Sequence, residues 1–153
     1  MVAVTEALTG GCQCGAVRYR LAHAPKAPAI CHCRMCQKAG GGPFMAFGGV
    51  PMEDFAWMRG APATFKSSDL ATRYFCALCG TPLAYKQDAS KRISATLGSL
   101  DDPAAAPPRE QLGVEARLPW AAALATLPDV RTLDWMAKRG IETAGSRQAP
   151  DRD

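Results

Sequence analysis

Seven cysteines in three short groups constrain this chain more than any other feature of its sequence. The groups are Cys12 and Cys14; Cys31, Cys33 and Cys36; and Cys76 and Cys79. In a reducing compartment, clustered cysteines indicate metal ligands or catalytic thiols rather than disulfides. An odd number of cysteines also leaves one thiol over in any pure disulfide framework. We therefore expect the fold to be built around metal ions.

The two outer pairs predict one closed metal site. Neither pair can fill a four-coordinate site alone, but together they supply four thiolates, the ligand set of structural zinc. On an extended chain the side chains of Cys12 and Cys14 would point to the same face. After Cys79, Gly80 can adopt a positive φ and close a tight knuckle. A two-metal cluster that shares bridging thiolates is the alternative arrangement.

The middle group, in the stretch CHCRMC, predicts an open site. Three thiolates leave the fourth position of a tetrahedral ion to water or substrate, which is typical of catalytic zinc. The alternative is a second structural site closed by a histidine, and the chain offers only His23 and His32. His32 lies between two of the cysteines and would point away from their metal on an extended segment. We therefore expect two Zn²⁺ ions per chain, the catalytic one at Cys31, Cys33 and Cys36.

Three cations lie close to cysteines in the sequence. Arg34, Lys38 and Arg73 could bind a substrate carboxylate, or they could be solvated surface charges. The glycine run at 40–42 could place backbone N–H groups beside the open metal, or it could be a turn.

Short alternating runs predict a mainly β fold. Val17, Tyr19 and Leu21 alternate with polar or small residues, as in a half-buried strand. Runs of this kind cover 16–21, 43–50, 63–68, 71–76, 82–87, 92–100 and 111–118. Two short helices are expected at 121–127 and 132–140. We expect one domain over 1–143 and a disordered tail over 144–153, because the tail is polar and lacks periodicity.

Charge and hydropathy indicate in which cell compartment the protein acts and which kinds of partner it binds. The first residues lack a basic segment, and no stretch approaches the roughly 18 apolar residues of a membrane span, so we expect a cytoplasmic protein. The formal net charge of +4 falls to about +1 once seven thiolates and two Zn²⁺ ions are counted. Lysine and arginine are scattered, so nucleic acid is not expected as the partner.

Together the motifs resemble those of a known family. CxCG from Cys12, CHCxxC from Cys31 and FCxxCGTPL up to Leu83 have the spacing of the glutathione-dependent formaldehyde-activating (GFA) family, which is related to centromere protein V. The resemblance implies a β-tent zinc-binding fold of short antiparallel strands, with a structural zinc on the outer pairs and a catalytic zinc on the middle group. It also implies a carbon–sulfur lyase of the S-(hydroxymethyl)glutathione synthase type, which acts on a thiol and an aldehyde such as glutathione and formaldehyde.

Two positions depart from the family pattern. Many members carry a serine or threonine shortly after CHCxxC, where this chain has Ala39, Gly40 and Gly41. Many also carry a histidine near the position of Gln111 and Leu112. These differences concern the substrate rather than zinc binding. A non-catalytic zinc scaffold that binds a protein partner and, less well supported, a nucleic-acid-binding module are the alternatives to the enzyme.

Overall fold

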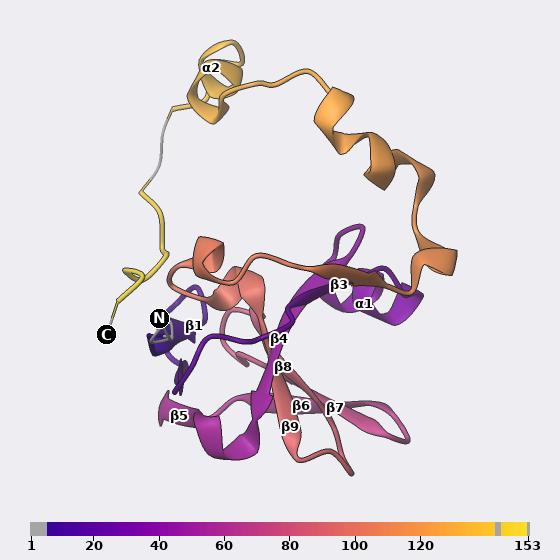
Figure 1. The fold of residues 1–153 in the computed structure, drawn as a ribbon. Coiled ribbons are helices and arrows are strands. Elements are labelled where there is room, and N and C mark those ends of the chain that lie inside the picture. The colour runs from indigo at the N-terminus through magenta and orange to yellow at the C-terminus, as the bar shows by residue number, and fades with distance from the viewer. Residues whose placement is uncertain (1–5, 143–144, 153) are drawn as a thin grey trace.

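Short antiparallel strands dominate the structure, as the sequence predicts (Figure 1). The computed structural model describes residues 6–142 and 145–152. One sheet has three strands in the order β1–β2–β5 and antiparallel pairing. Its strands are β1 (Leu8–Gly11), β2 (Arg18–Leu21) and β5 (Phe55–Arg59).

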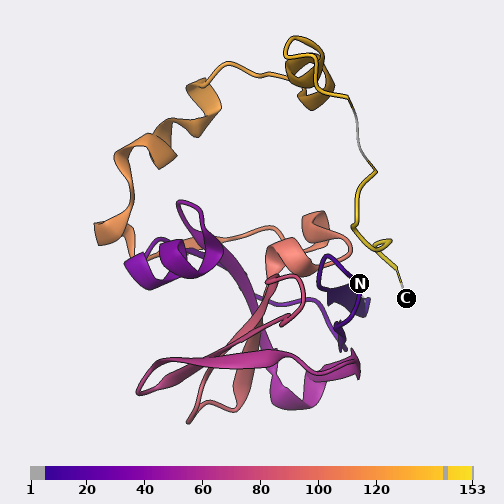
Figure 2. The ribbon, with the colours of Figure 1, turned by 180° about the vertical axis from the view of Figure 1, so that it is seen from behind.

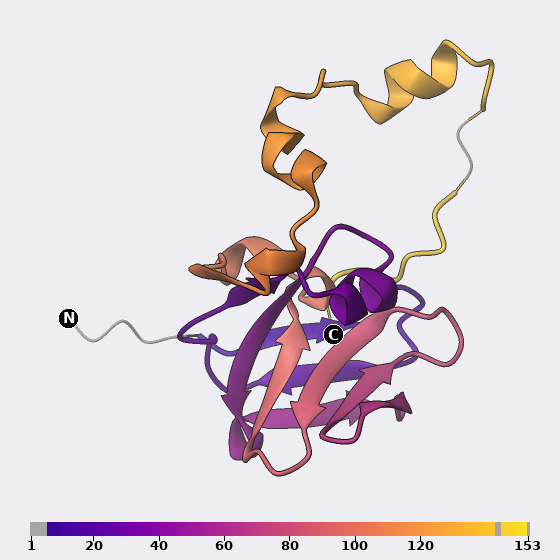
Figure 3. The same ribbon diagram turned by 90° about the vertical axis from the view of Figure 1, so that its right-hand side faces the viewer.

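The second sheet has seven strands, in the order β10–β3–β4–β9–β8–β7–β6. They are β3 (Ala29–Cys31), β4 (Met45–Pro51), β6 (Ala63–Ser68), β7 (Ala71–Phe75), β8 (Pro82–Gln87), β9 (Arg92–Thr96) and β10 (Glu110–Leu112). Only the pairing of β10 with β3 is parallel. Figure 3 shows the smaller sheet lying against the larger one.

Alternation along the strands gives the larger sheet one core face and one outer face. Ala84 lies opposite Ala95 in the ladder of β8 and β9, and both are buried in the core. The neighbouring pair, Tyr85 opposite Ser94, points to the outer face. The outer face is therefore free to carry a functional site while the core face packs against the smaller sheet.

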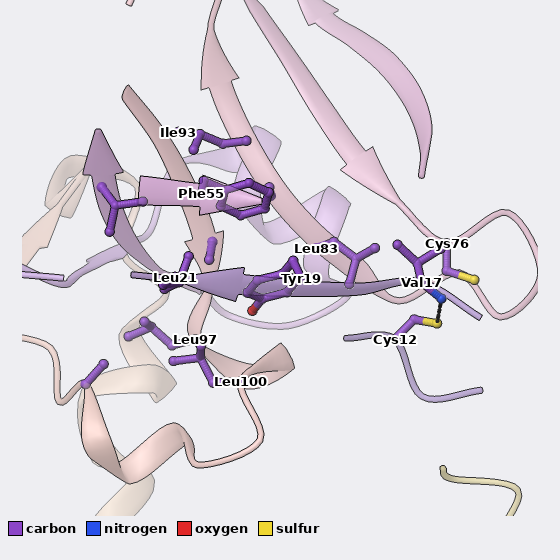
Figure 4. Packing of buried hydrophobic residues seen from close by; sticks show 14 residues of the cluster. Cys12, Val17, Tyr19, Leu21, Phe55, Cys76, Leu83, Ile93, Leu97 and Leu100 are labelled. Carbon is purple, nitrogen blue, oxygen red and sulfur yellow. Dashed lines mark hydrogen bonds between the residues drawn. The ribbon is translucent and has the colours of Figure 1, made fainter. Parts of the chain in front are cut away.

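Tyr19 lies at the centre of the core between the sheets. It is fully buried and stacks on Phe55 with ring centroids 5.2 Å apart (Figure 4). It also meets the edge of Trp57, with ring centroids 6.0 Å apart. The hydroxyl lies 2.8 Å from Ser99 Oγ, so the one polar atom of the ring has a partner. Burial is the main cause that raises the pKa of Tyr19 above its usual range.

Helices are short. The α-helices are α1 (Arg34–Gly40) and α2 (Thr132–Ala137), and the 3₁₀ helices are η1 (Met52–Asp54), η2 (Leu97–Ser99), η3 (Pro103–Ala105), η4 (Val114–Ala116) and η5 (Pro119–Thr126). The first expected helix, at 121–127, is thus a 3₁₀ helix, and the second ends three residues early. No helix in the described ranges is long and apolar enough to cross a membrane.

The chain beyond η4 leaves the sheets. Residues 117–142 arc away from the body and carry exposed apolar side chains, including Trp120 and Trp135 (Figures 1 and 2). The chain then returns, and the Ala149 backbone N–H donates to the Gln13 carbonyl at 2.7 Å. The predicted boundary between domain and tail, at residues 143 and 144, lies outside the described residues.

Asp101→Asn is expected to destabilise the folded protein by about 3 kcal/mol. Arg18, which is 4% exposed, donates to both carboxylate oxygens of Asp101 at 2.7 and 2.6 Å. These bonds lower the pKa of the Asp101 carboxyl, so the ionised pair stabilises the protein at neutral pH and stops doing so as the pH falls through that lowered pKa. Urea denaturation of the zinc-loaded protein at pH 7 measures the change.

Asp88→Asn is the matched control. Asp88 pairs with Lys66 on the surface, where solvent screens the interaction, so its loss should cost less than about 1 kcal/mol. Similar small shifts for both variants would contradict a stabilising role for the Arg18–Asp101 pair.

Candidate metal centres and the pocket between the strands

Two tight turns bring the outer cysteine pairs together. In the first turn, the Gly15 backbone N–H donates to the Cys12 carbonyl at 2.9 Å, and Gly15 has a φ of 76°. In the second, the Gly80 N–H donates to the Cys76 carbonyl at 2.9 Å, and Gly80 has a φ of 77°. The positive φ expected at Gly80 is confirmed. The first pair, however, lies in a turn rather than on the extended strand end that we expected.

The four sulfurs have the separations of a tetrahedral site. Those of Cys12, Cys14, Cys76 and Cys79 all lie within 4.8 Å of one another. Cys12 and Cys14 are 3.5 Å apart, and Cys14 and Cys76 are 3.7 Å apart. A zinc–sulfur distance of about 2.3 Å gives tetrahedral edges of about 3.8 Å. This cluster therefore fits a metal ion with four thiolate ligands.

The surroundings of these sulfurs favour negative charge at Cys79 and disfavour it at Cys14. The Val17 backbone N–H points at Cys12 Sγ, 3.2 Å away (Figure 4), and the Thr81 hydroxyl lies 3.2 Å from Cys79 Sγ. Burial raises the pKa of Cys79, but bonds from Thr81 outweigh it and lower this pKa to about 6. The Ala16 N–H lowers the pKa of Cys14, but neighbouring thiols raise it to about 12.

The second cluster is built from a strand end and a helix start. Cys31 ends β3, Cys33 is the N-cap of α1, and Cys36 lies in the first turn of that helix. Cys33 Sγ accepts a hydrogen bond from the Cys36 backbone N–H at 3.4 Å. Cys31 ends a strand and Cys33 has a φ of −59° and a ψ of 153°, so the segment around His32 is extended as expected, and the helix starts only at Arg34. All three sulfurs lie within 4.8 Å of one another, as three ligands of one ion require.

The three thiols of this second cluster differ in their electrostatics. Burial is the main cause that raises the pKa of Cys36, which reaches about 12, although Arg73 donates to its sulfur at 3.5 Å. Burial also raises the pKa of Cys33, but hydrogen bonds from the backbone and side chain of Cys36 outweigh it, so the net pKa is lowered.

His32 does not join this cluster. Its Nε2 lies 2.8 Å from Gln111 Oε1 on β10, and its ring meets the edge of Phe44 at 5.5 Å. Its buried Nδ1 has no partner in the described protein. In residues 6–142 and 145–152, no histidine or carboxylate completes the group formed by Cys31, Cys33 and Cys36.

A pocket of about 500 Å³ opens onto the second cluster from the outer face of the larger sheet. All three sulfurs line it, and no sulfur of the four-cysteine cluster does. Phe47, Tyr85 and Leu112 give it apolar walls. Its charged lining residues are Lys26, Arg73, Arg92 and Glu110. The two clusters therefore differ in kind, since one is closed by four sulfurs and the other faces a positively charged pocket.

The three predicted substrate cations, Arg34, Lys38 and Arg73, line one smaller depression together. Of the three, Arg73 alone also lines the larger pocket, whereas Arg34 and Lys38 lie on α1 outside it. The glycine run ends the helix: Gly41 has a φ of 66° and donates its N–H to the Gln37 carbonyl at 2.9 Å. The sequence reasoning missed Lys26 and Arg92. The alternation that places Ser94 outside the core could have indicated Arg92, two residues earlier on β9.

Comparisons with known proteins agree with this arrangement. The family model described as "Glutathione-dependent formaldehyde-activating enzyme" matches residues 7–115, a range that includes both clusters. A crystal structure of a Rhodobacter sphaeroides protein from structural genomics superposes with a TM-score of 0.55 at 20% identity. The match covers 67% of this chain and 98% of that one, and it supports the fold alone. A search of curated proteins finds no match.

Proposed function

The chain belongs to the glutathione-dependent formaldehyde-activating enzyme family, and we propose that it is a zinc-dependent carbon–sulfur lyase or synthase that acts on the adduct of a thiol and an aldehyde, as an S-(hydroxymethyl)glutathione synthase does. One observation carries the proposal: three cysteine sulfurs with metal-ligand separations face a pocket large enough for a small molecule. Four other sulfurs form a separate closed group. In this proposal the four-cysteine group has the structural role and the three-cysteine group the catalytic role.

Each donor set has its own role in this proposal. Cys12, Cys14, Cys76 and Cys79 hold a structural zinc, and Cys31, Cys33 and Cys36 hold a catalytic zinc. When bound, the second Zn²⁺ would supply an open coordination position and a positive charge that favours the thiolate form of an incoming thiol. The sulfur–carbon bond forms at the carbonyl carbon, and the carbonyl oxygen takes the proton that the thiol gives up. The reverse reaction is the lyase step.

The pocket contributes binding and orientation. Its apolar walls exclude water, and Lys26, Arg73 and Arg92 outnumber Glu110, so the pocket favours a thiol that carries a negative charge. Arg34 and Lys38 could meet only a substrate that extends past the pocket onto α1. Holding thiol and aldehyde side by side can lower the barrier by up to about 7–11 kcal/mol in well-aligned systems.

Zinc-loaded protein is expected to accelerate adduct formation between formaldehyde and a small thiol above the enzyme-free rate. The assay follows loss of free thiol or free aldehyde. It compares glutathione, thiols that carry a single carboxylate, and uncharged thiols with zinc-loaded and metal-depleted protein. Because the pocket lining is positive, the acidic thiols should show the lower KM.

The same assay discriminates the alternatives. Inactivity with glutathione alone would exclude that substrate and leave the reaction type standing. No metal-dependent rate across the whole panel of thiols and aldehydes would contradict the enzyme and favour a zinc scaffold that binds a protein partner.

A further inference from the structure

Arg73 differs from the other cations of the pocket in what it touches. It lies on β7, opposite Phe65 of β6 and Tyr85 of β8. Its Nη2 donates to Cys36 Sγ at 3.5 Å, and its Nη1 donates to Met45 Sδ at 3.7 Å. Its guanidinium carbon lies 5.2 Å from the centre of the Tyr85 ring. The ring and the two sulfurs together fix the plane of the guanidinium.

No carboxylate shares this contact. Within the described part of the chain, ion pairs join Arg18 to Asp101 and Lys66 to Asp88, and neither includes Arg73. Three thiolates around one Zn²⁺ carry a net charge of about −1, and a half-buried guanidinium beside one of them offsets that charge. Cys36, at 5% exposure, is buried in the protein and the Arg73 bond reaches it from the pocket side.

We infer that Arg73 is a positioning residue that holds Cys36 as a metal-bound thiolate, rather than primarily a docking group for a substrate carboxylate. The inference rests on the proposed zinc at Cys31, Cys33 and Cys36. An N–H···S bond withdraws electron density from the sulfur, so Cys36 stays a ligand and does not compete with the incoming thiol as a nucleophile. Partners of metal ligands of this kind contribute about 10–100-fold in metal affinity.

The position of Arg73 on β7 also ties the two clusters to one element. Cys76 of the four-cysteine cluster follows β7 directly, so it stands three residues beyond Arg73. An arginine that only binds a substrate carboxylate could stand at several positions in the pocket lining. A partner for Cys36 has to be placed to within about 0.5 Å, and a strand that is paired on both sides and followed directly by a metal ligand is suited to that.

Arg73→Ala is expected to weaken zinc binding at the open site by about 10–100-fold, while the other zinc ion stays bound. Competition with a chromophoric chelator measures the two affinities separately. In Co²⁺-loaded protein, the thiolate-to-cobalt absorption band should shift. At saturating zinc, iodoacetamide should alkylate Cys36 faster than in the wild type, whereas Cys31 and Cys33 should change less. None of these measurements requires catalytic activity, so they stand apart from the proposed function.

Two further variants make the test decisive. Arg92→Ala removes a cation of the same pocket that bonds the Gly49 carbonyl and no cysteine, so it should leave zinc affinity and Cys36 alkylation unchanged. Arg73→Lys keeps the charge and should restore part of the zinc affinity. Wild-type zinc affinity and alkylation in Arg73→Ala would overturn the inference, as would an equal effect of Arg92→Ala. Partial rescue by lysine would separate an electrostatic role from a packing role.

Discussion

Cys76→Ser is expected to leave the chain unfolded or insoluble. The side chain is 1% exposed, and its sulfur lies 3.7 Å from that of Cys14, so serine would disrupt the proposed four-thiolate site from within the core. Structural zinc contributes about 10–16 kcal/mol of apparent binding energy in small domains. This is comparable to the whole stability of a typical domain, about 5–15 kcal/mol. Circular dichroism, with soluble yield, measures the outcome.

Leu78→Ser is the matched control for this variant. Leu78 lies between Cys76 and Cys79 in the same turn but is 81% exposed, so its replacement should keep the fold and both metal ions. Elemental analysis of the control should give two zinc ions per chain, as for the wild type. A folded Cys76→Ser protein with wild-type melting behaviour would contradict a structural role for the four-cysteine cluster.

The cysteine pairs and the group of three could be predicted from sequence because the members of each are close neighbours in the chain. The two distant pairs, 62 residues apart at Cys14 and Cys76, could be joined because the group of three can hold an ion without them. CxC and CxxC each bring two sulfurs within reach of one ion, and a following glycine closes the turn. Gly80 adopts the positive φ that this argument requires. Likewise, the alternation of Val17, Tyr19 and Leu21 indicated a strand, and β2 buries Tyr19 and Leu21. For the turn at Gly80 and for strand β2, neighbouring residues contain the signal.

The elements that sequence reasoning missed lack such signals. α1 has no serine, threonine, aspartate or asparagine at its start, and the cap is supplied by the sulfur of Cys33, which capping rules do not include. β1 (LTGG) contains two glycines, and β3 (AIC) has only three residues, too few for a period to show. β5 (FAWMR) also escaped notice. These segments are strands because their neighbours in the sheets pair with them.

The pocket could not be predicted because it depends on register between distant strands. Lys26, Arg73 and Arg92 come from three separate segments, and only their placement on the outer face brings them near Cys36. The partner of Cys36 is likewise 37 residues away in the sequence. Such long-range contacts follow from the pairing order of the larger sheet, in which β9, β8 and β7 are consecutive.

Cys36→Ser is expected to reduce the metal-dependent rate of adduct formation by about 100-fold or more while the protein stays folded. The reason is that Cys36 belongs to the proposed catalytic site and not to the proposed structural site. Cys36 lines the pocket, and its loss leaves two thiolates of the three that the open site offers. The four-cysteine cluster is untouched, so the melting temperature should fall only modestly. Elemental analysis should then give about one zinc ion per chain.

Comparison with Cys31→Ser tests whether the three thiols act as one unit. Both cysteines line the same pocket, but among the described residues Arg73 donates a hydrogen bond to Cys36 and not to Cys31. If zinc binding alone matters, the two variants should lose activity to the same extent, since either leaves an incomplete ligand set. Collapse of Cys36→Ser to the level of Cys76→Ser would show that the open site is structural as well. Activity that survives with one zinc ion bound would place the chemistry elsewhere and contradict the proposed function.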